Sequence, residues 1–276
     1  MENIDLSFLL SKANLGDVNA LYELATYYQN NNEHELAFNY AYKGATRYYP
    51  PCERKLAYFY EKGIGTSIDY SMAVHYYNLA ISHGDVPSIT NLGLLYYKGL
   101  GVDKNDGKAF ELISLAADKN NLNAISILAR FYHLGVGVIK DDHKYFELLS
   151  KAKDLGERNM YHLLGLCYYN GVGVEQSYEN AFMNFVAGSE EGDNECFYYL
   201  GLMSIAGEGC QKDYTRALYY YQEGAKSGDL RAMYNLALFY ENGVYVPKNM
   251  ELAIYWLKLA ASKGFKEANE KLEKLL

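Results

Sequence analysis

The sequence of 276 residues is poor in several features that mark particular classes of protein. It holds only four prolines, one tryptophan and four cysteines. No stretch approaches the roughly 20 apolar residues that a membrane-spanning helix needs. The opening residues MENIDLSFLLSK lack the basic start and the long apolar segment of a secretory signal peptide. We therefore expect a cytoplasmic protein with no membrane segment.

Positive charge is also scarce. The 26 Lys and Arg residues are outnumbered by 34 Asp and Glu, which gives a formal net charge of -8. Nucleic acids and anionic membranes select basic surfaces, so the balance argues against both as partners. An acidic surface also keeps a protein in solution, and this plainer explanation accounts for the charge equally well.

The cysteines give no sign of a disulfide framework or a metal site. Cys52 and Cys196 occupy a position that holds small residues elsewhere in the chain, so we expect buried free thiols typical of a reducing compartment. No Cys-x-x-Cys or Cys/His spacing suggests zinc. We expect neither a metal nor any other cofactor.

What the chain does contain is a pattern that returns every 36 residues. A leucine followed by glycine or alanine recurs at Leu56–Ala57, Leu92–Gly93, Leu128–Ala129, Leu164–Gly165, Leu200–Gly201 and Leu236–Ala237. A pair of glycines follows in phase at Gly63/Gly65, Gly99/Gly101, Gly135/Gly137, Gly171/Gly173 and Gly207/Gly209. A period of this length indicates a solenoid, in which each unit buries its apolar face against its neighbours.

Each unit is expected to be a pair of antiparallel helices. In residues 86–121, Ser88, Leu92 and Tyr96 follow one another at helical spacing and form one buried face. The glycines then supply the positive φ that ends the first helix, and residues 103–106 offer an N-cap for the second.

The repeated motif resembles that of the Sel1-like repeat (SLR) family, which belongs to the tetratricopeptide-repeat-like (TPR-like) superfamily. The fifth unit carries it in Leu164–Gly165, Tyr168, Gly171, Gly173–Val174 and Ala181. The resemblance implies an all-α fold, a right-handed α-solenoid of antiparallel helix pairs. It also implies work as an adaptor or scaffold in bacterial and other protein assemblies.

The period sets the expected boundaries within one continuous solenoid domain. They are an N-terminal capping helix in 1–17, repeat 1 in 18–49, repeat 2 in 50–85, repeat 3 in 86–121, repeat 4 in 122–157, repeat 5 in 158–193, repeat 6 in 194–229, repeat 7 in 230–265 and a C-terminal capping helix in 266–276. Repeat 1 departs from the pattern, because Asn30–Asn32 replaces the glycine loop with a tighter turn. The last loop has Tyr245 in place of its second glycine.

The resemblance to TPR-like arrays places the first helix of each pair on the concave face. The positions two before, two after and five after the conserved leucine would then face solvent, and they are rich in aromatic and aliphatic residues. From these positions we predict the partner-binding residues Tyr22, Arg54, Tyr58, Tyr97, Arg130, His133, His162, Tyr169, Tyr198 and Tyr234. The arginines would bind carboxylates, and the tyrosines would stack and donate hydrogen bonds. In a tightly wound solenoid some of the ten would instead be ordinary packing residues.

Each motif that suggests catalysis is incomplete or lies in the wrong structural context. The Gly-x-Gly-Val loops follow helices rather than strands and lack the Gly-Lys-Ser/Thr of a phosphate-binding loop. The run Ser150–Lys153 matches one motif of penicillin-interacting enzymes, but neither companion motif occurs. His133 and His162 could approach each other on the concave face, yet no third metal ligand accompanies them. We expect no catalytic residues and no enzymatic activity.

The sequence therefore predicts a monomeric, non-enzymatic interaction scaffold that binds a protein or peptide on its concave face. The alternative is a bacterial immunity or inhibitor protein that occludes the active site of a toxin or effector enzyme, since an acidic chain suits a basic toxin. A third interpretation, a hydrolase acting on cell-wall amides, requires a nucleophile that we do not find.

Overall fold

The computed structural model describes residues 6–275, and 74 % of it is helical. These residues form 16 α-helices with no strand among them, so the expected all-α fold is confirmed. They divide into two compact units, residues 1–140 and 141–276, which we describe separately. No helix in the described range is long and apolar enough to cross a membrane.

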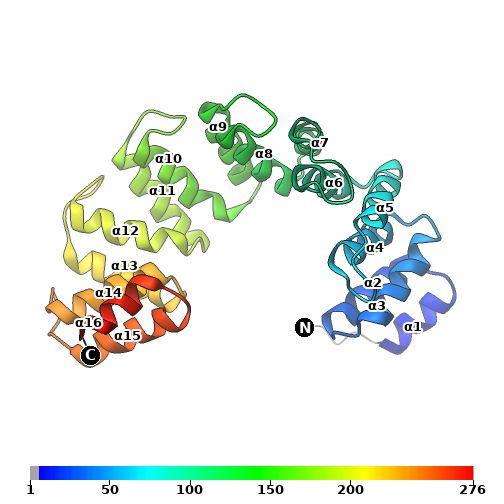
Figure 1. Ribbon diagram of the computed structural model, residues 1–276. Coiled ribbons are helices and arrows are strands. Elements are labelled where there is room, and N and C mark those ends of the chain that lie inside the picture. The colour runs from blue at the N-terminus through cyan, green and yellow to red at the C-terminus, as the bar shows by residue number, and fades with distance from the viewer. Residues whose placement is uncertain (1–5, 276) are drawn as a thin grey trace. The chain divides into compact units, whose positions relative to one another are not determined.

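The first unit holds a lone helix followed by antiparallel pairs (Figure 1). Its helices are α1 (Leu6–Asn14), α2 (Val18–Asn30), α3 (His34–Ala45), α4 (Pro50–Lys62), α5 (Tyr70–Ser82), α6 (Val86–Lys98), α7 (Asp106–Asp118) and α8 (Leu122–Leu134). The helix expected at the N-terminus is α1, which packs on α2. Residues 1–5 of that expected segment lie outside the described residues.

The second unit continues the alternation. Its elements are α9 (Asp142–Asp154), a 3-10 turn at Arg158–Met160, α10 (Tyr161–Asn170), α11 (Tyr178–Glu191), α12 (Glu195–Ala206), α13 (Tyr214–Lys226), α14 (Leu230–Asn242), α15 (Met250–Ser262) and α16 (Lys266–Leu275). The closing helix α16 packs on α15 and keeps a charged outer side.

Local sequence signals set where the helices begin and end. Asn105 precedes α7, and its side chain accepts a hydrogen bond from the backbone N–H of Lys108 at 2.8 Å. Gly99 ends α6 in the left-handed conformation with φ 68°. In repeat 1 the turn between α2 and α3 is short, as expected, and Asn32 takes a positive φ of 60°. These caps satisfy backbone groups that a helix leaves unpaired at its ends.

The second glycine of each loop lies against the preceding repeat. A Cβ on Gly101 would overlap the carbonyl group of Tyr70, the first residue of α5. The same relation recurs at Gly65 with His34, Gly137 with Asp106, Gly173 with Asp142 and Gly209 with Tyr178. In the last loop Tyr245 keeps a positive φ of 53°, and its ring stacks on Tyr214 with centroids 5.1 Å apart. Each loop is therefore built on two consecutive repeats.

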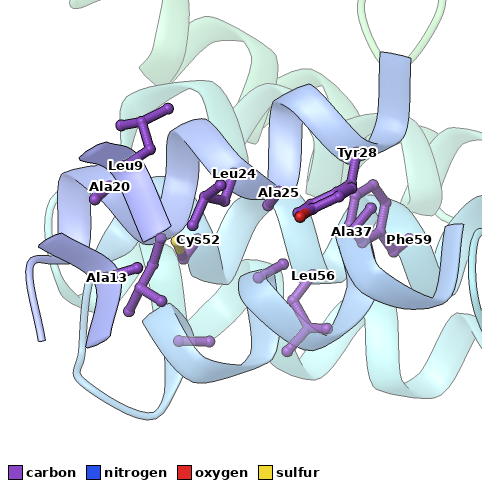
Figure 2. Close-up of a cluster of buried hydrophobic side chains, with 13 residues drawn as sticks. Leu9, Ala13, Ala20, Leu24, Ala25, Tyr28, Ala37, Cys52, Leu56 and Phe59 are labelled. Atoms are coloured by element: carbon purple, nitrogen blue, oxygen red, sulfur yellow. The ribbon is translucent and has the colours of Figure 1, made fainter. Parts of the chain in front are cut away.

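Small residues of one helix pack against the apolar side chains of the next. Figure 2 shows Leu9 and Ala13 of α1 in one cluster of buried side chains with Leu24 of α2 and with Cys52 and Leu56 of α4. Cys52 and Cys196 are fully buried, as the sequence predicts. Stacking of this kind buries a continuous core along each unit.

We call α2, α4, α6, α8, α10, α12 and α14 the first helices, and the helices that follow them in each pair the second helices. Within the units, α2 touches α4, and α12 touches both α10 and α14. No two second helices of the described chain come equally close. The first helices therefore lie on the inner side of each unit, and their solvent-facing surface is called the first-helix face below.

Candidate functional site

The ten predicted binding residues lie on first helices, but their contacts differ. Arg54 Nη1 donates to Asp85 Oδ1 at 2.6 Å, and His162 Nδ1 lies 2.8 Å from Asp193 Oδ2. Each acceptor lies 31 residues further on, at the end of the same repeat and just before the first helix of the next. Arg54 and His162 thus connect consecutive repeats, besides lying on the face.

The two aspartates are well suited to hold such contacts. Asp85 is only 9 % exposed and accepts a hydrogen bond from the N–H of Ser88 at 2.9 Å, which caps α6. Asp193 is 2 % exposed and also accepts from the backbone N–H of His162 at 3.0 Å. Buried carboxylates need such partners, because an unpaired buried charge is strongly destabilising.

The positions two residues after the conserved leucine are the open part of the face. Tyr58 is 37 % exposed and Leu202 is 39 % exposed. Arg130 is also exposed and forms no ion pair with the described residues. These side chains project from α4, α8 and α12, where a partner could reach them.

Other predicted tyrosines are held by contacts within the chain. The ring of Tyr97 packs on Phe131 with centroids 5.3 Å apart, and Tyr234 packs on Phe265 at 5.7 Å. His133, one turn beyond Ala129 on α8, is partly buried and has interactions of its own. His133 belongs to the first unit and His162 to the second, so their expected approach stays a prediction.

Four of the predicted tyrosines lie beneath cationic side chains, among them Tyr58 beneath Lys62 and Tyr97 beneath Lys104. Lys55 Nζ stands 5.1 Å from the ring centre of Tyr22, and the guanidinium of Arg231 lies 4.4 Å from that of Tyr198. Such cation–π contacts hold an aromatic ring and a charge together on a surface. Burial is the largest contribution to the raised pKa of Tyr198.

The remaining predicted tyrosine, Tyr169, is fixed by its hydroxyl. The hydroxyl donates to Glu208 Oε2 at 2.7 Å, across the step from α10 to the loop after α12. This hydrogen bond, followed by burial, raises the pKa of Tyr169 to about 12. The ring also packs on Tyr178 at 5.1 Å, so one edge of it remains for a ligand.

Three consecutive first helices of the first unit enclose a polar hollow of about 240 Å³. Its lining residues are Tyr22, Gln29, Arg54, Lys55, Tyr58 and Asn91. Lys55 Nζ donates to Gln29 Oε1 at 2.9 Å, and burial lowers the pKa of Lys55. We call this the polar hollow.

The second unit has a smaller, largely apolar hollow of about 140 Å³ on its first-helix face. Its lining residues are Leu166, Tyr169, Asn170, Tyr199, Leu202 and Met203. We call this the apolar hollow. Its size suits a single aliphatic or aromatic side chain.

Sequence reasoning missed five residues that line these hollows: Lys55, Asn91, Tyr199, Asn170 and Met203. Lys55, Asn91 and Tyr199 lie one position before the conserved leucine of their helix, at a position that we did not assign to the surface. The sequence did offer one signal. Lys55 lies between the conserved positions of Cys52 and Leu56, and a lysine is rarely buried without a partner.

Groups capable of chemistry are dispersed or shielded. No group of three or more His, Cys, Asp or Glu side chains in the described chain could hold a metal ion. Cys52 and Cys167 are buried, and burial raises the pKa of each thiol to about 12. At neutral pH these two thiols are protonated, which makes them poor nucleophiles.

Comparison with known proteins identifies the repeat. The family model described as the Sel1 repeat matches residues 50–85, 86–121, 123–157, 159–193, 197–229 and 230–265. A search of the curated proteins found no match.

Solved structures with the same fold come from bacteria. The crystal structure of c5321, a protective antigen present in uropathogenic Escherichia coli strains and displaying an SLR fold, is 28 % identical, with a TM-score of 0.81. That alignment covers 99 % of this chain and 59 % of c5321, so the chain spans well under two thirds of it. A Sel1 repeat protein from Oxalobacter formigenes is also 28 % identical, with a TM-score of 0.74 over 87 % of this chain and 96 % of that one.

A third structure, the immunity protein Pa5087 from Pseudomonas aeruginosa, is 22 % identical, with a TM-score of 0.46 over 70 % of this chain and 74 % of that one. A superposition of that quality carries no argument about function.

Proposed function

Because the chain belongs to the Sel1 repeat family, whose members are generally non-enzymatic scaffolds that bind other proteins, we propose that it binds a protein partner on its first-helix face. The observation that carries this proposal is the pair of hollows on that face, one polar and one apolar. Four of the ten predicted residues line them: Tyr22, Arg54, Tyr58 and Tyr169.

The contacts within the chain divide the ten residues by role. Tyr58 and Arg130 are exposed and are proposed to contact the partner directly. Arg54 and His162 are proposed to shape the face by binding the next repeat. The others, Tyr22, Tyr97, His133, Tyr169, Tyr198 and Tyr234, are proposed to present ring edges while their remaining surface is packed. Rigid aromatic side chains with a few arginines are typical of the residues that dominate protein interfaces.

Site-specific photocrosslinking tests which face binds. A photoreactive phenylalanine analogue would replace Tyr58 or Leu202 on first helices, or Met183 or Tyr219 on second helices. The two control side chains are 61 % and 55 % exposed, so access does not favour the test positions. After irradiation in native lysate, we expect covalent partner complexes from the first-helix positions only. Complexes from the second-helix positions alone would contradict the proposal.

The captured partner then permits a measurement of affinity. Tyr58→Ala should weaken binding about 30-fold, since a central interface tyrosine contributes about 2 kcal/mol or more. Its thermal unfolding should match that of the wild type, because Tyr58 is exposed. A single tight one-to-one complex with an enzyme that loses its activity would instead favour the inhibitor over the scaffold.

A further inference from the structure

Lys55 is the cation of the polar hollow that lacks a carboxylate partner among the described residues. Its neighbour Arg54 is paired with Asp85 at 2.6 Å, and Lys62, two turns further along α4, is paired with Glu61 at 2.7 Å. Lys55 Nζ instead donates to the neutral amide oxygen of Gln29. A protonated lysine has three N–H donors, so this bond leaves donors for another acceptor.

The surroundings of Lys55 keep its charge but shield it from water. The ring centres of Tyr22 and Phe59 lie 5.1 and 5.7 Å from Nζ. Burial lowers the pKa of Lys55, which means that the fold disfavours its charged form in the absence of a ligand. The hydrogen bond to Gln29 and the two ring contacts hold the ammonium group, but none of them supplies a negative charge.

The hollow also supplies neutral donors beside the ammonium group. Tyr58 of α4 and Asn91 of α6, which carry a hydroxyl and an amide, line it. Asn91 also forms a side-chain hydrogen bond with Tyr77. An ammonium flanked by hydroxyl and amide donors complements an anionic acceptor with two oxygens. The positive charge stands out in a chain whose net charge is -8.

We propose that Lys55 binds the carboxylate of an aspartate or glutamate side chain within an extended segment of the partner, with Tyr58 and Asn91 as further donors. This inference rests on the proposed function and specifies the partner chemistry at the same face. A side-chain carboxylate is favoured over a chain end, because the hollow spans α2, α4 and α6 and the face continues to Tyr97. A segment that enters the hollow can therefore run on beyond it.

Small probes test the hollow without knowledge of the partner. N-acetylglutamate methylamide carries the side-chain carboxylate, N-acetylglutamine methylamide is its neutral match, and N-acetylalanine carries a terminal carboxylate. The pKa of Lys55 is followed by NMR through the 13Cε signals of 13C-lysine-labelled protein, with Lys55→Arg assigning the signal. We expect N-acetylglutamate methylamide to bind with a millimolar dissociation constant and to raise the pKa of Lys55, because a bound anion stabilises the ammonium.

The other two probes and two lysine variants serve as controls. N-acetylglutamine methylamide should leave the signal unchanged, and N-acetylalanine should bind more weakly than the glutamate compound. In Lys55→Met the glutamate compound should no longer shift the NMR signals of Tyr58 and Asn91, and the urea midpoint should stay near that of the wild type. The control Lys98→Met, which removes an exposed lysine of α6, should retain those shifts. Equal responses to the glutamate and glutamine compounds, or an unshifted pKa of Lys55 at saturation, would overturn the inference. A stronger response to N-acetylalanine would assign the hollow to a chain end instead.

The crosslinking experiment separates this inference from the proposed function. Partner complexes formed at Tyr58 that are as abundant in a Lys55→Met background would refute the carboxylate contact and leave the proposed function standing. Absence of complexes at both first-helix positions would refute the proposed function, while the small-probe titration would still decide whether the hollow binds carboxylates.

Discussion

The Cα of Gly44 on α3 faces the Sγ of Cys52 on α4 so closely that a Cβ at residue 44 would overlap the thiol. The same pairing occurs in the second unit, where a Cβ on Gly188 would overlap Cys196 Sγ. In both cases the larger residue of one repeat sits opposite a glycine of the repeat before it. The two positions therefore share one fixed volume.

This shared volume predicts a compensating pair of substitutions. Gly44→Ala should lower the free energy of unfolding by about 1–3 kcal/mol, because an added methyl group overpacks the boundary. Cys52→Ala should lower it by about 1 kcal/mol through loss of buried volume. The double variant should recover part of the loss, since the sulfur is gone, but a Cβ at residue 44 would still lie 2.7 Å from the Cβ of residue 52. Urea unfolding of the four proteins measures the coupling, and simple additivity of the two losses would contradict the shared volume.

The ion pair of Arg54 with Asp85 predicts that Asp85 stabilises the fold in two ways, as the cap of α6 and as the partner of Arg54. Asp85→Ala should lower the free energy of unfolding by about 2–3 kcal/mol, because it removes the cap of α6 and leaves Arg54 without its carboxylate. Asn105→Ala is the matched control, since Asn105 caps α7 and forms no ion pair. That variant should lose only about 1 kcal/mol. Equal losses in chemical unfolding would show that the link to Arg54 adds nothing to stability.

The contact of Gly101 with the preceding repeat predicts a cost beyond backbone strain. Gly84 and Gly101 both have a positive φ, 91° and 70°, but a Cβ on Gly84 would meet nothing within 4 Å. Gly84→Ala should therefore cost about 1–2 kcal/mol from the left-handed conformation alone. Gly101→Ala should cost at least about 1 kcal/mol more, because its Cβ would overlap the Tyr70 carbonyl. Thermal and urea unfolding of the two variants compare the costs, and equal losses would rule out the close approach.

The hydrogen bond from Tyr169 to Glu208 predicts a dependence on alkaline pH. The raised pKa of Tyr169, about 12 against about 10 for an ordinary tyrosine, means that the folded state favours the neutral phenol. This stabilising contribution is complete below pH 10 and is lost as the pH rises through 12. Tyr169→Phe should lower the free energy of unfolding by about 1 kcal/mol at pH 8.

Between pH 10 and 11 the stability of Tyr169→Phe should decline less steeply than that of the wild type, as measured by urea unfolding at fixed pH. Tyr234→Phe controls for the loss of a hydroxyl, because the Tyr234 hydroxyl has no hydrogen bond to the described residues. If the free energies of unfolding of the wild type and Tyr169→Phe declined in parallel, the hydrogen bond to Glu208 would not be what keeps the Tyr169 hydroxyl protonated.

The fold could be predicted from the sequence because its signals are local and repeated. Gly99 and Asn105 end and begin helices through groups only a few residues away, and each signal recurs 36 residues later. Even the departures followed from local sequence, as the short turn at Asn32 shows. Because the same signals recur in each repeat, the interpretation of one repeat can be tested on the next.

The candidate site could be predicted only in part, because its contacts join residues of different repeats. Arg54 and His162 occupy positions that generally face solvent, yet their acceptors Asp85 and Asp193 lie 31 residues away, just before the first helix of the following repeat. The donors and the two aspartates were visible in the sequence, but only the folded backbone shows that they meet. Lys55 was not predicted because its column, one position before the conserved leucine, holds a different residue in most repeats, such as Asn91 and Ile127. A search for residues shared between repeats passes over such a column.

The seating of Gly101 against Tyr70 has a consequence for how such a chain changes over evolutionary time. The contact surface between neighbouring repeats, here called the seam, is formed by residues of both repeats. A peptide of a single period would therefore carry only half of a seam. The shortest fragment that keeps one seam intact carries two consecutive periods. Gain or loss of a whole period keeps every remaining seam intact, whereas a residue inserted at a seam disturbs the two repeats that form it.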